Sequence, residues 1–394
     1  AMLGVKAVPA IGGIARYVEE LGSRLAERGH EVTVYCRPHY MGDDNGKYYK
    51  GMKRIVTRGL KGKHLDALTH TFTAALHALR QDYDILHIHG SAPGVVAPLL
   101  KLRRDGHIVV TVHGLDWMGS KWSRPASWLM SRAARVTAAN AHRLVAVSEY
   151  IQQVYQAHTG RRVDVIPTGV KVAAIPPPCR ITQLGLQPNR YIFCAARFVP
   201  EKGLHYLVDA FNSLDTDMKL VIAGDWAYED EYVKRLLANR NGKVVFPGYV
   251  KGRLLAELYA HCYVYVQPSL LEGLSISVLE ALSYGCCVLA SDIPANLEAL
   301  GPCGYTFKAG DTDSLREQLS WLLTHPDDVQ AEFEKARSYI ARERNWDITA
   351  DRYEALYLGL LGREAVQERT VEQSQASTVG QQHDSVREAE TRPG

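Results

Sequence analysis

Several features that would place this 394-residue chain in a common protein class are missing from its sequence. No apolar run reaches the roughly 18 residues needed to cross a bilayer, and the first residues lack the pattern of a signal peptide. We therefore expect a cytoplasmic chain that neither enters nor spans a membrane by itself. The seven cysteines form no Cys-x-x-Cys pair and no zinc-like spacing, which indicates buried free thiols in a reducing compartment.

Strong charge and a dinucleotide-binding fingerprint are missing too. The formal net charge of +3 is too small to indicate nucleic acid as a partner. Gly12 and Gly13 form a glycine-rich turn, but it is not Gly-x-Gly-x-x-Gly and no suitably spaced acidic residue follows, which counts against a nicotinamide dehydrogenase. The turn either lets backbone approach a ligand or is simply tight. His87 and His89 alternate on one strand face without a third ligand, so we expect no metal site.

The order of apolar segments predicts an α/β protein with two doubly wound, Rossmann-like domains. Short strand-like runs, the first at residues 1–8, alternate with amphipathic helices, the first at residues 13–28, which is typical of parallel sheets covered on both faces. A single core rarely exceeds about 250–300 residues, so two domains are expected. A proline-rich stretch interrupts the alternation. We predict domains at 1–170 and 188–345, a linker at 171–187, a closing helix at 346–362 and a disordered tail at 363–394. Ligands of such sheets bind at the carboxyl ends of the strands, here in a cleft between facing domains.

The most informative stretch is Glu-Gly-Leu-Ser-Ile-Ser-Val-Leu-Glu at residues 272–280. It places Glu272 in a loop and Glu280 inside the following helix, with backbone N–H groups at the helix start between them. N–H groups and a helix dipole favour phosphate oxygens, while a carboxylate accepts hydrogen bonds from sugar hydroxyls. Ser277 and Glu280 also have capping-box spacing, so a second interpretation is that Glu280 only caps its own helix.

Two cations follow the strand that begins the second domain. Arg197 ends this strand, and Lys202 opens the next helix, where the dipole disfavours a cation. A bound diphosphate would reverse that sign, because cations and dipole would share one anion. The alternative is that both side chains are solvated.

One strand end and one basic segment of the first domain carry further candidates. His113 ends a strand and is suited to hydrogen-bond a phosphate or a sugar hydroxyl, although a lone histidine is more often structural. Asp116 and Trp117 follow it in a loop, where an aromatic ring could stack on a sugar. The lysine- and arginine-rich segment 47–64 leaves two interpretations open: contact with anionic lipid or a phosphate-bearing acceptor, or a solvated loop.

Taken together, the chain to about residue 362 resembles the family-four retaining glycosyltransferases of the GT-B fold. Residues 29–37 and 62–66 are similar to the branch found in bacterial exopolysaccharide and surface-glycan clusters. The segments that carry the family resemblance are Gly12–Arg16, Val112–Gly114, Val147–Glu149, Ile166–Val170, Arg197–Gly203, Ala223–Asp225, Pro247–Gly248 and Glu272–Glu280.

The resemblance implies a role for each candidate residue. Arg197 and Lys202 would neutralise the diphosphate of a nucleotide-sugar donor, Glu272 would contact the donor sugar, and Glu280 would hold the ribose. The remaining donor-side residues would be Gly12, Gly13, His113, Gly273, Leu274 and Ser275. The acceptor-side residues would be Arg16, His89, Asp116 and Trp117.

The implied reaction is sugar transfer to a glycan or lipid-linked acceptor with retention and without a metal or other cofactor. The leaving phosphate itself would deprotonate the acceptor. A nucleotide-sugar epimerase of the same fold and a non-catalytic scaffold are the alternatives. Three departures stand out: the first strand lacks its usual start, Thr168 replaces the commoner Asn, and Leu274-Ser275 replaces an aromatic–glycine pair, which leaves the donor open.

Overall fold

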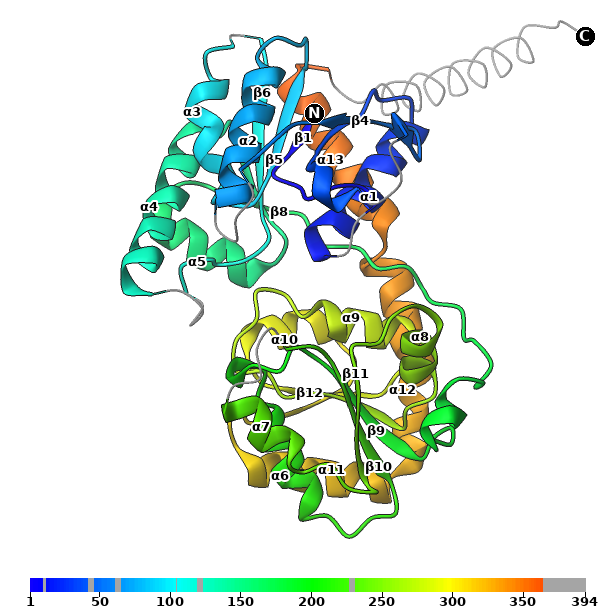
Figure 1. Cartoon of the computed structure of the whole chain (residues 1–394). Helices are drawn as coiled ribbons and strands as arrows, with labels where there is room; N and C mark the ends of the chain where they lie inside the picture. Colours follow the sequence, from blue (N-terminus) through cyan, green and yellow to red (C-terminus); the bar gives the residue numbers. More distant parts are fainter. Residues whose placement is uncertain are drawn as a thin grey trace, which may run out of the picture.

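The structure is a computed structural model of the chain. The residues that it describes are 1–9, 12–41, 46–60, 65–103, 105–118, 123–226 and 231–363. Most of the predicted tail, 364–394, and part of the motif at 62–66 therefore lie outside the described residues. Two parallel-sheet domains face each other, one built on an eight-stranded sheet and the other on a six-stranded sheet (Figure 1).

The first domain contains a sheet of order β3-β4-β2-β1-β5-β6-β7-β8, parallel except for β3. Its strands are apolar and buried because helices cover both faces. The strands are β1 (Met2–Leu3), β2 (Thr33–Cys36), β3 (Tyr48–Tyr49), β4 (Met52–Val56), β5 (Ile85–His89), β6 (His107–Val112), β7 (Arg143–Ala146) and β8 (Asp164–Val165). The helices are α1 (Gly13–Glu27), α2 (Leu65–Ala78), α3 (Ala97–Leu100), α4 (Arg124–Asn140) and α5 (Glu149–Thr159).

The second domain repeats this architecture with a fully parallel sheet of order β11-β10-β9-β12-β13-β14. Its strands are β9 (Tyr191–Ala195), β10 (Lys219–Ala223), β11 (Val244–Gly248), β12 (Val264–Gln267), β13 (Val288–Ser291) and β14 (Tyr305–Phe307). Its helices are α6 (Leu204–Asn212), α7 (Glu231–Leu237), α8 (Gly252–Ala260), α9 (Ile276–Ser283), α10 (Pro294–Leu300), α11 (Thr312–Thr324) and α12 (Pro326–Glu343). The predicted pair of doubly wound domains is confirmed.

A final helix, α13 (Trp346–Leu360), returns to the first domain and lies beside α1 (Figure 1). The Tyr17 hydroxyl donates to the Tyr353 hydroxyl at 2.9 Å, and the Tyr357 hydroxyl bonds Nδ1 of His87 at 2.6 Å. Gly169 makes this return compact, because a Cβ there would lie 2.6 Å from the backbone of Trp346.

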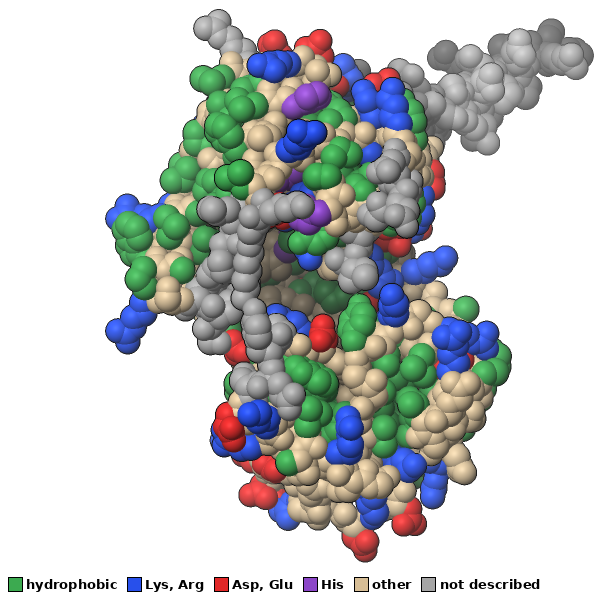
Figure 2. Space-filling model, viewed as in Figure 1, with side chains coloured by type: hydrophobic (Ala, Val, Ile, Leu, Met, Phe, Trp, Pro, Cys, Tyr) green, Lys and Arg blue, Asp and Glu red, His purple; other side chains and the backbone are tan. Residues whose placement is uncertain are grey.

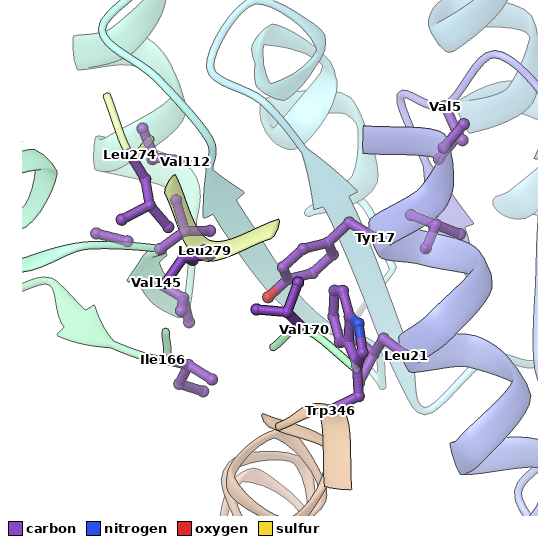
Figure 3. Close-up of a cluster of buried hydrophobic side chains, with 14 of the residues drawn as sticks. Val5, Tyr17, Leu21, Val112, Val145, Ile166, Val170, Leu274, Leu279 and Trp346 are labelled. Atoms are coloured by element: carbon purple, nitrogen blue, oxygen red, sulfur yellow. The ribbon is translucent and has the colours of Figure 1, made fainter. Parts of the chain in front are cut away.

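One buried hydrophobic cluster continues from the first domain into the second. Figure 3 shows Leu274 and Leu279 of the second domain beside Val112 and Val145 of the first. On the other side of the same view, Trp346 packs against Tyr17. The two domains are therefore joined by a packed core as well as by the chain.

The structure differs from the sequence-based expectation in two segments of the first domain. The first strand was expected over residues 1–8 but ends at Leu3, because Gly4 turns the chain at φ +81° against the carbonyl of His89. The basic segment 47–64 contains β3 and β4. Arg54 of β4 is buried and donates to the Val8 carbonyl at 3.1 Å, so this cation is structural.

The cysteines are free thiols, six of them buried, while Cys179 is exposed. Within the described ranges, no helix is long and apolar enough to cross a bilayer.

Candidate active site

A cavity of about 780 Å³ lies between the two domains, at the carboxyl ends of the strands. Figure 2 shows the hollow between the two halves of the molecule. The described residues that line it are Gly12, Gly13, Ile14, Arg16, Tyr17, Glu19, Glu20, Gly90, His113, Gly114, Asp116, Val147, Thr168, Gly169, Val170, Leu274, Ile276, Glu280 and Trp346. Both domains and the start of α13 thus contribute to one site.

The N-terminus of α1 opens into this cavity. The helix begins at Gly13, and the preceding Gly12 has φ +135° and supplies no side-chain cap. A Cβ on either glycine would meet no described atom within 4 Å, so the backbone is accessible. The first N–H groups of a helix lack intrahelical partners and carry partial positive charge, which makes this end suited to an anion such as a phosphate.

Glu280 lies across the cavity on α9 and joins the domains through an ion pair. Nη1 of Arg16 donates to Oε1 of Glu280 at 2.8 Å, and the Tyr259 hydroxyl donates to Oε2 at 3.5 Å. Burial raises the pKa of the Glu280 carboxyl, and the charge of Arg16 and the bond from Tyr259 lower it in part. Arg16 was expected on the acceptor side, and the structure pairs it with the carboxylate expected to hold the ribose.

Glu280 also lines a second pocket, of about 210 Å³, that continues into the second domain. Arg197 lies at its edge, is exposed, and its side chain makes no hydrogen bond or ion pair with other described residues. Apolar side chains form much of the wall, including Tyr249, Val250 and Leu255. Both pockets are lined by Glu280, so this carboxylate lies between an apolar recess and the N-terminus of α1.

Lys202 and Glu272 form an ion pair with each other. Nζ of Lys202 donates to Oε1 of Glu272, and the same oxygen accepts from Ser269 Oγ at 2.8 Å and Gln267 Nε2 at 3.0 Å. The two charged side chains are only 16% and 12% exposed. The side chain of Lys202 is therefore not solvated, and it already has an anionic partner in Glu272. It was expected to open the next helix, but it ends a 3-10 turn at Pro200–Lys202, two residues before α6. There it is held by a carboxylate that also accepts from two neutral donors.

The loop before α9 contacts the first domain. The Ser148 hydroxyl donates to the Gly273 carbonyl at 3.0 Å, and a Cβ on Gly273 would lie 3.4 Å from the His113 carbonyl. Ser275 precedes α9 but makes no capping bond; its hydroxyl donates to Oδ1 of Asn296. Because α9 starts at Ile276, Ser277 is not its N-cap. The alternative in which Glu280 and Ser277 form a capping box is therefore wrong.

His113 faces the cavity in front of a buried histidine. Its Nε2 shares a hydrogen bond with Nδ1 of His89 at 3.1 Å, and the Tyr17 ring packs edge-on at 4.7 Å. Burial lowers the pKa of His113 to about 3, so its imidazole is neutral at pH 7. His89 is fully buried behind it, whereas it was expected on the acceptor side.

The loop after His113 separates the two remaining acceptor-side candidates. Asp116 lines the cavity. Trp117 stacks on His158 of α5 at 4.6 Å and is not among the described lining residues. The described part of the chain contains no group of three or more His, Cys, Asp or Glu side chains arranged to hold a metal ion.

Comparison with known protein families matches both halves of the chain. Residues 11–174 match the description "Glycosyltransferase Family 4", and residues 182–346 match "Glycosyl transferases group 1". The chain belongs to the family 4 glycosyltransferases. The predicted family is thereby confirmed.

Curated relatives of this glycosyltransferase are distant. An uncharacterized glycosyltransferase, YqgM of Bacillus subtilis, is 28% identical over 56% of this chain and 62% of its own length, which is less than two thirds of that relative. N-acetyl-alpha-D-glucosaminyl L-malate synthase of Bacillus anthracis is 24% identical over 91% of this chain and 97% of its own.

Solved structures show the same two-domain GT-B fold. Sucrose-phosphate synthase of Thermosynechococcus elongatus has a TM-score of 0.76 at 20% identity, over 92% of this chain and 98% of its own. HepE of Anabaena, in complex with UDP and glucose, has a TM-score of 0.74 at 17% identity, over 90% and 98%. The likeness at this level of identity concerns the fold.

Three residues that hold the candidate carboxylates of this glycosyltransferase were not predicted from its sequence. Tyr259 on α8 reaches Glu280, while Gln267 and Ser269 hold Glu272. Gln267 ends the buried strand β12 and Ser269 follows two residues later. Polar residues at the carboxyl end of an apolar strand are a signal that could have identified this pair. Nothing in the local sequence marks Tyr259.

Proposed function

We propose that this glycosyltransferase moves a sugar from a nucleoside-diphosphate sugar to a hydroxyl of a glycan or lipid-linked acceptor. The observation that carries the proposal is the open N-terminus of α1 in the same cavity as Glu280, where the apolar pocket at Tyr249 begins. A phosphate, a ribose and a base need these three environments in this order. HepE, whose fold is the same, binds UDP and glucose in its solved structure.

The donor would lie across the cavity with its diphosphate at Gly12 and Gly13. The ribose hydroxyls would donate to Glu280 and compete with Arg16 for this carboxylate. The base would enter the recess beside Tyr249 and Val250. The sugar would then reach the loop at residues 272–275.

Departure of the diphosphate is the step in which negative charge builds up. Arg197 lies at the edge of the pocket, where its side chain pairs with no other described residue, and Lys202 can share its donors between Glu272 and the phosphate oxygens. Together with the dipole of α1 they supply the charge stabilisation that a divalent ion supplies in other transferases, so we propose transfer without a metal ion.

Retention follows from where a base can lie. His113 is neutral and donates or accepts a hydrogen bond at the donor sugar without changing charge near pH 7. Glu272 is engaged by three donors, which makes it a poor nucleophile. The leaving phosphate would therefore take the acceptor proton on the face that it vacates, and the anomeric configuration would be kept.

Donor-dependent stabilisation and turnover test the proposal. We would screen the protein against UDP-, GDP-, ADP- and dTDP-sugars in EDTA, and measure the melting temperature and nucleotide release. A rise of several degrees with one donor, lost in Glu280→Ala, is expected. Binding with interconversion of the free nucleotide sugar, but no transfer, would instead indicate an epimerase. The absence of any donor effect would favour a non-catalytic scaffold.

A further inference from the structure

The outward face of α4 exposes large apolar side chains. Trp128 is 61% exposed, Leu129 55% and Val136 42%. Single exposed hydrophobic residues are common, but three on one side of one helix form a patch. The side of α4 that packs on the domain is formed by Ala133, Ala134, Thr137 and Ala138.

The same face of α4 carries charge of only one sign. Arg124, Arg132 and Arg135 are exposed, and the Arg132 guanidinium lies 5.0 Å from the Trp128 ring centroid. No acidic residue occurs in the sequence between Asp116 and Glu149. A helix that only meets water usually mixes both signs, because acidic and basic neighbours stabilise each other at helical spacing.

The apolar surface continues onto the neighbouring helices. α3 contacts α4, and Leu102, two residues after the end of α3, is 74% exposed. Beyond it, a groove of about 550 Å³ runs between α2 and the segment before α3, lined mostly by apolar side chains such as Phe72 and Leu99. Figure 2 shows hydrophobic side chains over these helices, and basic ones beside them at α4.

We propose that this face, formed by Trp128, Leu129, Arg132 and Arg135 of α4 with Leu102, docks on the surface of a bilayer that contains anionic lipid. Tryptophan and leucine insert at the level of the headgroups, and arginines bind their phosphates. The exposed face of α4 combines apolar side chains with charged side chains that are all basic. It therefore matches both the apolar layer and the negative charge of such a bilayer. A protein partner would need neither feature along the whole helix.

The basic segment 47–64 is the competing membrane site within the described residues. There Arg54 is buried and Lys50 pairs with Glu19 at 2.8 Å, which leaves Lys47, Lys53 and Arg58. This segment exposes Tyr48, Val56 and Leu60 but no tryptophan. Glu19 lies against it and accepts from Tyr49 and Lys50, whereas the sequence of α4 contains no acidic residue. The structure therefore favours α4.

Docking through α4 would also fix the position of the cavity relative to the bilayer. The helix follows the loop that carries His113 and Asp116, both of which line the cleft. A bilayer under α4 would hold the mouth of the cleft near lipid-linked acceptors. This consequence rests on the proposed transfer reaction, whereas the docking itself does not.

Vesicle flotation of the full chain without donor tests the docking. We compare phosphatidylcholine vesicles with vesicles that contain about 30% phosphatidylglycerol. Binding is expected to the anionic vesicles alone. Arg132→Gln/Arg135→Gln is expected to lower partitioning about 25-fold, since each cation contributes about fivefold. Trp128→Ser/Leu129→Ser is expected to lower it at least about tenfold through lost apolar burial.

Matched controls separate this face from general charge. Lys234→Gln/Arg235→Gln on α7 removes the same charge from the second domain and is expected to leave binding unchanged, as is Lys47→Gln/Lys53→Gln. Melting temperatures of all variants show that they fold. The proposal is overturned if the wild-type protein does not float with anionic vesicles, if the α4 variants bind as well as wild type, or if the Lys47 and Lys53 variant loses binding instead. Self-association that depends on Trp128, without vesicle binding, would assign the face to a second copy.

Discussion

Replacing Lys202 by methionine separates the structural and the chemical role of this cation. Lys202 donates to a carboxylate oxygen of Glu272 that also accepts from Ser269 and Gln267. The variant removes the charged donor and leaves two neutral donors on a poorly exposed carboxylate. Loss of one hydrogen bond to a charged group costs about 1.5–3 kcal/mol. For a domain of this size the expected fall in melting temperature is about 3–12 °C.

The same substitution is expected to slow turnover more than it destabilises the fold. Lys202 is one of two side-chain cations proposed at the leaving diphosphate, and removal of one such group costs about 10²–10³ in kcat. In the double variant Lys202→Met/Glu272→Gln no unpaired charge remains, so the melting temperature is expected to recover while kcat stays low. Thermal unfolding and steady-state rates measure the two effects. A single variant with kcat within about threefold of wild type, or a double variant that stays destabilised, would refute this reasoning.

Three further predictions concern the nucleotide and pH. Glu280→Gln is expected to weaken nucleotide binding at least about tenfold in calorimetry, since the neutral amide is a weaker acceptor for the ribose; unchanged affinity would place the ribose elsewhere. Gly13→Val is expected to keep the fold, since its Cβ meets no described atom within 4 Å, but to lose diphosphate affinity as the side chain enters the cavity; equal binding of diphosphate by this variant would move the anion away from α1. The depressed pKa of His113 means that the unfolded state binds more protons, so stability is expected to fall as pH drops from about 6.5 towards 3, and His113→Gln to flatten this slope in pH-dependent denaturation; an unchanged slope would contradict the burial of a neutral imidazole. Buried His87 and His89 act in the same direction.

The architecture was predictable because its signals are local and repeated. Apolar runs separated by amphipathic helices predict two parallel sheets, and α1 starts at the predicted Gly13. The first strand was harder, because Gly4 ends it through a close approach to a residue 85 positions away in the sequence. The basic residues of 47–64 predicted either an anion-contacting segment or a solvated loop. Arg54 fits neither interpretation, because it is a buried structural cation.

The candidate site was predictable in its residue types but not in its pairing. Polar residues near strand ends singled out His113 and the two cations, and the spacing within residues 272–280 singled out both glutamates. The pairing of Arg16 with Glu280, and of Lys202 with Glu272, depends on distances across domains or between loops. Spacing alone left a capping box at Glu280 as a second interpretation, which the actual start of α9 excludes.

The stereochemistry of the product tests the central claim most directly. With the donor found in the screen, an α-linked nucleotide sugar would be incubated in EDTA with extracted lipid-linked and soluble acceptors, and the anomeric proton of the product followed by NMR. The account predicts an α-linked product and a rate independent of added divalent ions. A β-linked product, or turnover only after a metal is added, would contradict it.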